Sequence, residues 1–383
     1  KNQVGIKNIE IVIVDSGSKD NTINLAKVYG AKVISIPQED FTHSYARNIG
    51  GENASGDYFL FIVQDALPPT KTWLSELVNV LIINQLSAVS CAELPREDAD
   101  LFYRVISWNH YEFLEVNTKD QIRELPKTFN YVSLRKNGQL SDLACVMPKM
   151  VFNDYKYQTN YAEDLDFGLR LIKDGHRIGF LGSIRVIHSH NRPPFYFLKR
   201  GFVDNLYLSE IFPDFVVPET KFIELVYDIL YTFNFLSTQL LNEISNINYP
   251  CKPSELFLKI RETISPKGIK NYPKSIQKSM NRYLDIETHE FLTGLMKYYQ
   301  IEDVREKFKG IILQALLGYL NITFKYIENA YEIIDIHLAE DVKHCIFKEF
   351  SIIVGAHLSF CYKQNKPDDG YILQIHKILS QGI

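Results

Sequence analysis

Residues 11–22 read IVIVDSGSKDNT, a run of β-branched residues followed at once by a polar turn. Valine and isoleucine fit a buried strand, and a turn containing Gly17 ends it. Asp20 or Ser18 is placed to cap a helix that closes at Gly30. The stretch predicts a strand, a turn and a helix, which is the repeating unit of an α/β fold.

The same alternation continues over the first two hundred residues. Further strands are predicted at 32–36, 58–63, 86–91 and 185–187, with a helix over 73–83. This order predicts a mostly parallel sheet with helices on both faces. In such sheets ligands bind at the carboxyl ends of the strands, so the residues that follow each strand are the candidates for function.

From about residue 206 the apolar spacing becomes helical, and prolines near 249–253 and 266–273 divide this half into groups of helices. The pattern changes from alternating strands and helices to helical apolar spacing near 195–215. We therefore expect an α/β domain over 1–205 and an all-α domain over 206–383.

Composition restricts the class of protein. The 383 residues carry a formal net charge of −4, which gives no basic footprint for nucleic acid. Five scattered cysteines without a CxxC pair fit a reducing compartment better than a disulfide framework or a zinc knuckle. No signal peptide opens the chain, and the uncharged run 310–324 is short for a bilayer span. We therefore expect a soluble or peripheral protein.

Two of the candidate groups have polar or basic side chains that suit a nucleotide. Asp15 and Ser16 follow the first strand and can contact a base or ribose, although the same residue types make a helix cap and a tight turn. Arg47 has the planar donors that a diphosphate requires, although it can equally be a solvent-facing residue of a capped helix.

Two more groups place carboxylates where a reaction could use them. Gln64 and Asp65 end the 58–63 strand, and Asp65 can hold a hard divalent cation or simply belong to a turn. Glu163 and Asp164 begin a helix whose apolar face contains Leu165 and Leu169. The helix dipole is expected to lower the pKa of these acids, which then act as a cap or as a general base.

The last group follows the 185–187 strand. His188 and His190 point to opposite faces if the strand continues, so at most one of them would face the site. Next come Asn191, Arg192 and a basic, aromatic segment ending at Arg200. This segment can meet a sugar or a pyrophosphate-lipid headgroup, or it can be an amphipathic helix that covers the sheet.

In this order, DSGS, ARNxG, QDA, EDxD and HSHN, the groups resemble the family-2 inverting glycosyltransferases of the A-type nucleotide-binding fold. The motifs QDALP and VIHSHN are similar to those of bacterial rhamnosyltransferases of polysaccharide assembly. The resemblance covers about residues 8–205, which would then form the catalytic domain.

The resemblance implies a role for each group. Asp15 and Ser16 would contact the nucleotide together with Gln64, and Arg47 the nucleotide or its phosphates. A Mn²⁺ or Mg²⁺ ion at the diphosphate would be held by Asp65 and His188. Asp164 would be the general base that Glu163 orients, in a single displacement that inverts the anomeric carbon. Acceptor binding would fall to the residues that follow His188, namely His190, Asn191, Arg192 and Arg200.

Two departures from the family accompany this resemblance. The family begins with a strand and helix before the 11–14 run, and this chain starts too late to contain them. Gln64 and Ala66 stand where acids are common, which leaves Asp65 as the lone carboxylate of that motif. Both departures favour a catalytically silent scaffold, whereas the Glu163–Asp164 pair and His188 favour an enzyme.

The expected partners follow from the family. They are a nucleotide-diphosphate sugar as donor and a glycan or lipid-linked acceptor. The donor would carry L-rhamnose, or alternatively it would be a UDP-hexose or a UDP-N-acetylhexosamine. We expect a cytoplasmic location, with a helical domain that can contact the inner face of the membrane or another assembly enzyme. We expect no nucleic-acid partner.

Overall fold

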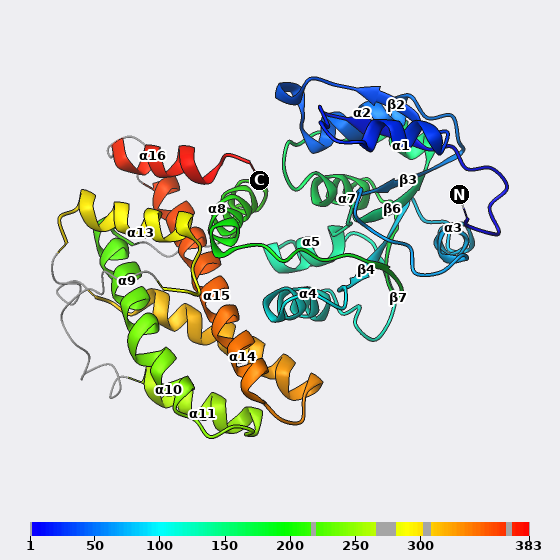
Figure 1. Ribbon diagram of the computed structural model, residues 1–383. Helices are drawn as coiled ribbons and strands as arrows, with labels where there is room; N and C mark the ends of the chain where they lie inside the picture. The colour runs from blue at the N-terminus through cyan, green and yellow to red at the C-terminus, as the bar shows by residue number, and fades with distance from the viewer. Residues whose placement is uncertain (1, 216–219, 266–280, 302–307, 365–369, 383) are drawn as a thin grey trace. The chain divides into compact units, whose positions relative to one another are not determined.

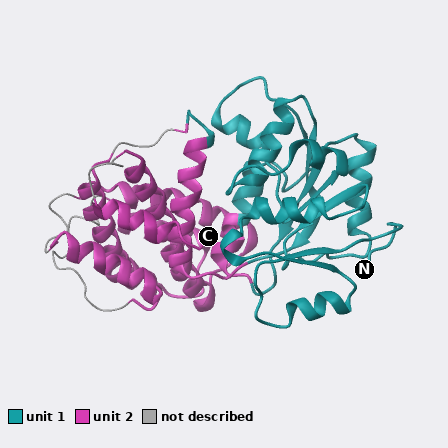
Figure 2. Ribbon diagram, turned by 90° about the horizontal axis from the view of Figure 1, so that it is seen from above, with its two compact units in different colours: residues 1–98, 107–189, 211–214 teal, residues 99–106, 190–210, 215–383 magenta. Residues whose placement is uncertain are grey.

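The computed structural model describes residues 2–215, 220–265, 281–301, 308–364 and 370–382, so the predicted break at 266–273 lies outside the described residues. Two compact units divide the chain (Figures 1 and 2). The first contains residues 1–98, 107–189 and 211–214, and the second contains 99–106, 190–210 and 215–383.

The first unit contains two sheets. Strands β1 (Val12–Asp15) and β2 (Lys32–Ser35) form a parallel pair. The other sheet has five strands in the order β3-β6-β4-β7-β5. The bounds of these five strands are β3 Tyr58–Ile62, β4 Ala88–Leu94, β5 Gln121–Arg123, β6 Ala144–Pro148 and β7 Ile178–Ile187.

Helices pack on both faces of the five-stranded sheet, as Figure 1 shows for α3 on one side and α5 and α7 on the other. Phe180 packs with Tyr111 of α4, whereas its neighbour Leu181 packs with Trp73 of α3, because successive strand residues face opposite ways. The helices of this unit are α1 Thr22–Val28, α2 His43–Glu52, α3 Trp73–Ile83, α4 Leu101–Phe113 (shared with the second unit), α5 Tyr131–Gly138, α6 Lys149–Tyr155 and α7 Glu163–Lys173, with a 3-10 turn at Gln38–Asp40.

The α/β class is confirmed, but the five-stranded sheet is mixed rather than mostly parallel. Within it β4 and β7 pair in parallel, while β3–β6, β4–β6 and β5–β7 are antiparallel. The prediction missed β6, which lies antiparallel between β3 and β4 and thereby keeps those two strands in the same direction. Helix α1 has Asn21 at its N-cap position, and the predicted cap residue Asp20 accepts a 2.9 Å hydrogen bond from the backbone N–H of Thr22, the first residue of the helix.

The second unit is helical. A π-helical turn at Leu236–Leu240 joins two of its helices, and Pro253 begins another, as the predicted break near 249–253 requires. Its helices are α8 Pro194–Ile211, α9 Phe222–Phe235, α10 Leu241–Ser245, α11 Pro253–Ile264, α13 Ile286–Tyr298, α14 Ile311–Ala330, α15 Ile336–Gln364 and α16 Gly370–Leu379.

Helix α15 is the core of the second unit. It crosses α8 so closely that a Cβ added at Gly355 would lie 1.9 Å from the carbonyl oxygen of Leu198, which explains the glycine. The helix is long enough for a membrane span, and an 18-residue window within it has a mean hydropathy of 1.3. However, 67% of that window is buried inside the structure. A buried helix of this kind is typical of a protein core.

Asp228 of α9 caps α14. Its side chain is fully buried and accepts hydrogen bonds from the backbone N–H groups of Lys309, Gly310 and Ile312 at 2.7–2.9 Å. A carboxylate is favourable at a helix N-terminus because it satisfies donors that have no partner inside the helix. The contact fixes the start of α14 against α9.

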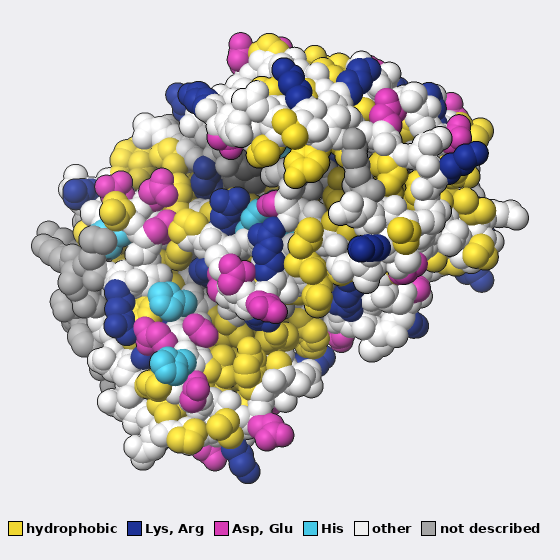
Figure 3. Space-filling model, turned by 45° about the vertical axis from the view of Figure 1, so that its right-hand side comes forward, with side chains coloured by type: hydrophobic (Ala, Val, Ile, Leu, Met, Phe, Trp, Pro, Cys, Tyr) yellow, Lys and Arg dark blue, Asp and Glu magenta, His cyan; other side chains and the backbone are white. Residues whose placement is uncertain are grey.

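The surface mixes both signs of charge. Figure 3 shows Lys and Arg side chains interspersed with Asp and Glu over the face drawn.

All five cysteines are buried free thiols.

Glu349 of α15 makes the stability of the second unit depend on pH. Burial raises its pKa to about 8, against the hydrogen bond that it accepts from Thr323. The folded protein therefore binds a proton that the unfolded chain loses near pH 4.5, and stability falls as pH rises from there to about 8.

We expect Glu349→Gln to remove this part of the pH dependence, at most about 1.4 kcal/mol per pH unit, and to stabilise the protein at pH 8. Urea unfolding between pH 5 and 8 measures it, with the exposed Glu332→Gln as control. Identical pH slopes for Glu349→Gln and wild type would contradict this account.

Candidate functional site

The carboxyl ends of β3, β4 and β7 lie at one edge of the sheet. Strands β4 and β7 are paired in parallel up to Leu94 and Ile187. Leu67, in the segment after β3, pairs with the same Ile187 through two backbone hydrogen bonds of 2.8 and 2.9 Å. The segments that follow β3 and β7 are therefore held side by side at this edge.

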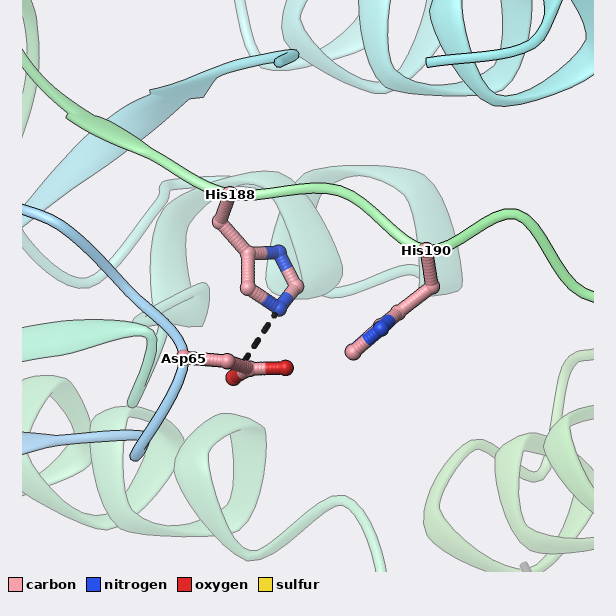
Figure 4. Close-up of side chains that lie close together, drawn as sticks. All are labelled: Asp65, His188 and His190. Carbon is pink, nitrogen blue, oxygen red and sulfur yellow. Dashed lines mark ion pairs between the residues drawn. The ribbon is translucent and has the colours of Figure 1, made fainter. Parts of the chain in front are cut away.

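Three predicted site residues meet there. The ligand atoms of Asp65, His188 and His190 all lie within 4.8 Å of one another, and Figure 4 shows the three side chains directed toward a common space. Nε2 of His188 lies 3.5 Å from a carboxylate oxygen of Asp65. One carboxylate and two imidazoles at this spacing fit a single transition-metal ion.

The prediction that at most one histidine faces the site was wrong. It assumed that the strand continues through residue 190, but β7 ends at Ile187. Beyond the strand the alternation of side chains no longer applies, so both rings can turn toward Asp65. His190, predicted among the acceptor-binding residues, lies beside the two predicted metal ligands.

Two residues at the end of β4 contact this group and were missed. Glu93 Oε2 lies 3.0 Å from Nδ1 of His188, and both side chains are buried. The Arg96 guanidinium donates to the backbone carbonyl of Asp65 and, at 3.2 Å, to that of Ser189. Both residues follow the predicted 86–91 strand directly, the position at which ligand-binding residues of an α/β sheet are expected.

A second polar group surrounds Arg47. Its Nε lies 3.0 Å from Asp142, and its Nη1 pairs with Glu163 at the start of α7. Asp142 also accepts a hydrogen bond of 3.0 Å from the hydroxyl of Tyr157. Arg47 is therefore neither solvent-facing nor remote from Glu163. Sequence gave no signal for Asp142, which lies 95 positions after Arg47.

Burial decides the electrostatics of this group. It raises the pKa of Asp142 to about 6, and it raises that of Glu163 as well, with Arg47 opposing both shifts. For Arg47 itself, burial lowers the pKa, but Asp142 and Glu163 more than offset this and hold it above its ordinary value. The expectation that the helix dipole lowers the pKa of Glu163 was wrong, because desolvation is the larger effect.

The two acids of α7 differ in environment. Glu163 is buried against Arg47, whereas Asp164 is half-buried and accepts a 2.7 Å hydrogen bond from the backbone N–H of Leu165. Ala162, just before them, has a left-handed backbone with φ of 50°. This costly conformation for a non-glycine residue turns the chain into the helix and sets the direction of both acids.

The predicted nucleotide contacts lie on turns. Asp15 accepts hydrogen bonds from the N–H groups of Gly17 and Ser18 at 3.0 and 3.1 Å. A hydrogen bond from the Ser18 side chain, together with these two, lowers the pKa of Asp15. Ser16 lies in this turn half-buried, and Gln64 is exposed after β3. Their contact with a nucleotide stays a prediction.

The remaining candidates belong to the second unit. The side-chain oxygen of Asn191 accepts from the backbone N–H of Asp100 at 2.9 Å. Arg192 lies over the ring of Tyr196, and Arg200 pairs with Asp204 one turn along α8. All three are exposed, and their contact with an acceptor stays a prediction.

The family of the first unit follows from comparison with known proteins. Residues 1–138 match the Glycosyl transferase family 2. The chain therefore carries a domain of this family, which confirms the resemblance drawn from its motifs.

Two relatives are O-antigen chain rhamnosyltransferases. WbaN of Salmonella anatum is 28% identical over 190 residues, which are 48% of this chain and 58% of that protein. RfbN of Salmonella typhimurium is 26% identical over 191 residues, again 48% and 58%. The matches thus span little more than half the length of these curated relatives.

Among solved structures, a mannosyltransferase from Pyrobaculum calidifontis in complex with GDP-Man and Mn²⁺ is similar to this chain. The match covers 86% of this chain and 80% of the mannosyltransferase chain. The identity is 13% and the TM-score 0.42, a likeness too low to carry an argument about this chain.

The Arg47 group predicts a large effect on stability. Arg47→Met would leave Asp142 and Glu163 buried without their cation, so we expect the free energy of unfolding to fall by about 3–5 kcal/mol. Lys136→Met, which breaks a pair with the exposed Glu115, is the control and should cost about 0–1 kcal/mol. Chemical unfolding measures both, and equal losses would refute the buried pairing.

Proposed function

We propose that this chain transfers a sugar, in the first instance L-rhamnose, from a nucleotide-diphosphate donor to a hydroxyl of a growing surface polysaccharide or lipid-linked glycan. The observation that carries the proposal is the convergence of Asp65, His188 and His190 after strands β3 and β7, in a chain whose residues 1–138 match the Glycosyl transferase family 2. The names of the relatives WbaN and RfbN support rhamnose and a polysaccharide acceptor.

We assign the cation site to Asp65, His188 and His190. Two imidazole ligands favour Mn²⁺ over Mg²⁺, because Mg²⁺ takes oxygen ligands almost alone. These residues would hold a cation that would supply positive charge opposite the leaving diphosphate. The donor would be contacted by Asp15, Ser16 and Gln64. Arg47 would contact the nucleotide or its phosphates, or it would support the donor site through its ion pair with Glu163 at the start of α7.

Asp164 would be the general base of a single displacement with inversion. It lies half-buried in the first turn of α7, next to Glu163. Glu163, paired with Arg47, would hold the start of the helix in place. Asp164 would then accept the proton of the acceptor hydroxyl as the new bond forms.

Asp164→Asn should lower the rate of sugar transfer about 10²–10⁴-fold and leave donor binding nearly unchanged, because it deletes only the base. Asp166→Asn, two residues along the same helix, is the matched control and should keep turnover. Transfer assays and calorimetry measure the two properties. Weaker donor binding by Asp164→Asn would instead assign Asp164 to the donor pocket.

Asp65→Ala should abolish the part of donor binding that depends on Mn²⁺. Asp57→Ala, at the opposite end of β3, should leave it intact because Asp57 is exposed and remote from the strand ends. Calorimetric titration with dTDP-rhamnose and UDP-sugars, with and without Mn²⁺, measures both. Donor affinity that does not change with the cation would defeat the metal assignment, and no binding of any donor would favour a silent scaffold.

A further inference from the structure

We infer that Glu93 and Arg96, at the carboxyl end of β4, are positioning residues that orient the metal-binding groups Asp65 and His188. This inference rests on the proposed function, since it takes these two groups as ligands of the cation. It assigns a purpose to two polar contacts in the interior of the first unit that the transfer reaction itself does not require.

Glu93 sets the orientation of the His188 ring. The carboxylate lies 3.0 Å from Nδ1. Nε2, the other ring nitrogen, lies 3.5 Å from a carboxylate oxygen of Asp65. A His188 that held the cation through Nε2 would therefore donate its Nδ1–H to Glu93. A carboxylate behind a histidine in this way fixes its tautomer and makes it a better ligand.

The position of Glu93 follows from the sheet. Its backbone pairs with Val186 in the parallel β4–β7 ladder, two positions before His188. The side chain is 6% exposed, and a carboxylate is costly to bury without a partner. Its backbone N–H donates to the hydroxyl of Tyr111 at 2.9 Å, so the strand is held there independently of the carboxylate.

Arg96 joins the two segments that carry the ligands. Its guanidinium contacts the carbonyl of Asp65 on one side and that of Ser189, next to His188, on the other. Its own backbone N–H donates to the Ser189 hydroxyl at 3.3 Å. A planar guanidinium can bridge two carbonyls in a fixed geometry, whereas the single ammonium of lysine cannot.

These contacts predict a site that is organised before the cation arrives. Without Glu93 the His188 ring can rotate away from Asp65, and without Arg96 the Asp65 segment can move away from residue 189. Changes of this second layer of contacts commonly weaken metal binding about 10–100-fold.

Mn²⁺ binding to the whole chain, measured by electron paramagnetic resonance of free Mn²⁺, tests the inference without a transfer assay. Glu93→Ala and Arg96→Lys should each raise the Kd for Mn²⁺ about 10-fold or more. Glu93→Gln keeps an acceptor for Nδ1 and should lose less. Tyr111→Phe removes a hydrogen bond at the same strand position and should keep the wild-type Kd.

Asp65→Ala separates this inference from the proposed function. Mn²⁺ binding that Asp65→Ala removes but Glu93→Ala and Arg96→Lys leave unchanged would overturn the positioning role and keep the metal site. Wild-type binding that Asp65→Ala does not alter would overturn both. If thermal unfolding shows that Glu93→Ala does not fold, Arg96→Lys and the near-isosteric Glu93→Gln decide together, and wild-type Kd values for both would contradict the inference.

Discussion

The parallel pairing of β4 with β7 is the interaction on which the candidate metal site depends. It brings Leu94 beside Ile187, so that Glu93 and His188 meet at the point where both strands end. The bridge from Leu67 to Ile187 adds the segment that follows β3. A slip of one residue in this register would turn the side chains to the opposite face of the sheet. The geometry of the site is thus a property of backbone pairing before it is one of side chains.

The first unit contains two groups of charged residues with different physical character. Around Arg47, the cation and its acids neutralise each other in a buried setting, and burial raises the pKa of Asp142 and Glu163. Around Asp65, oxygen and nitrogen ligands converge. The first arrangement suits a fixed support for the start of α7. The second suits the binding of a metal ion.

Local pattern predicted β1 to β4, the end of β7, the bounds of α3, and the placing of Asp65 and His188 after strand ends, because these depend on neighbouring residues. The mixed sheet was not predictable, because β6 is a short buried run whose direction is set by pairing with β3 and β4. The partnership of Arg47 with Asp142 joins distant parts of the chain for the same reason. The convergence of both histidines depends on where β7 stops, which hydrophobic pattern does not specify.

Crystals of this chain soaked in Mn²⁺ and measured at the manganese absorption edge test the central claim most directly. We predict one anomalous peak in the first unit, within about 2.5 Å of a carboxylate oxygen of Asp65 and of Nε2 of His188. The His190 ring should complete the set. A peak bound elsewhere in this unit, or Asp65 and His188 still paired to each other at saturating Mn²⁺, would contradict the account.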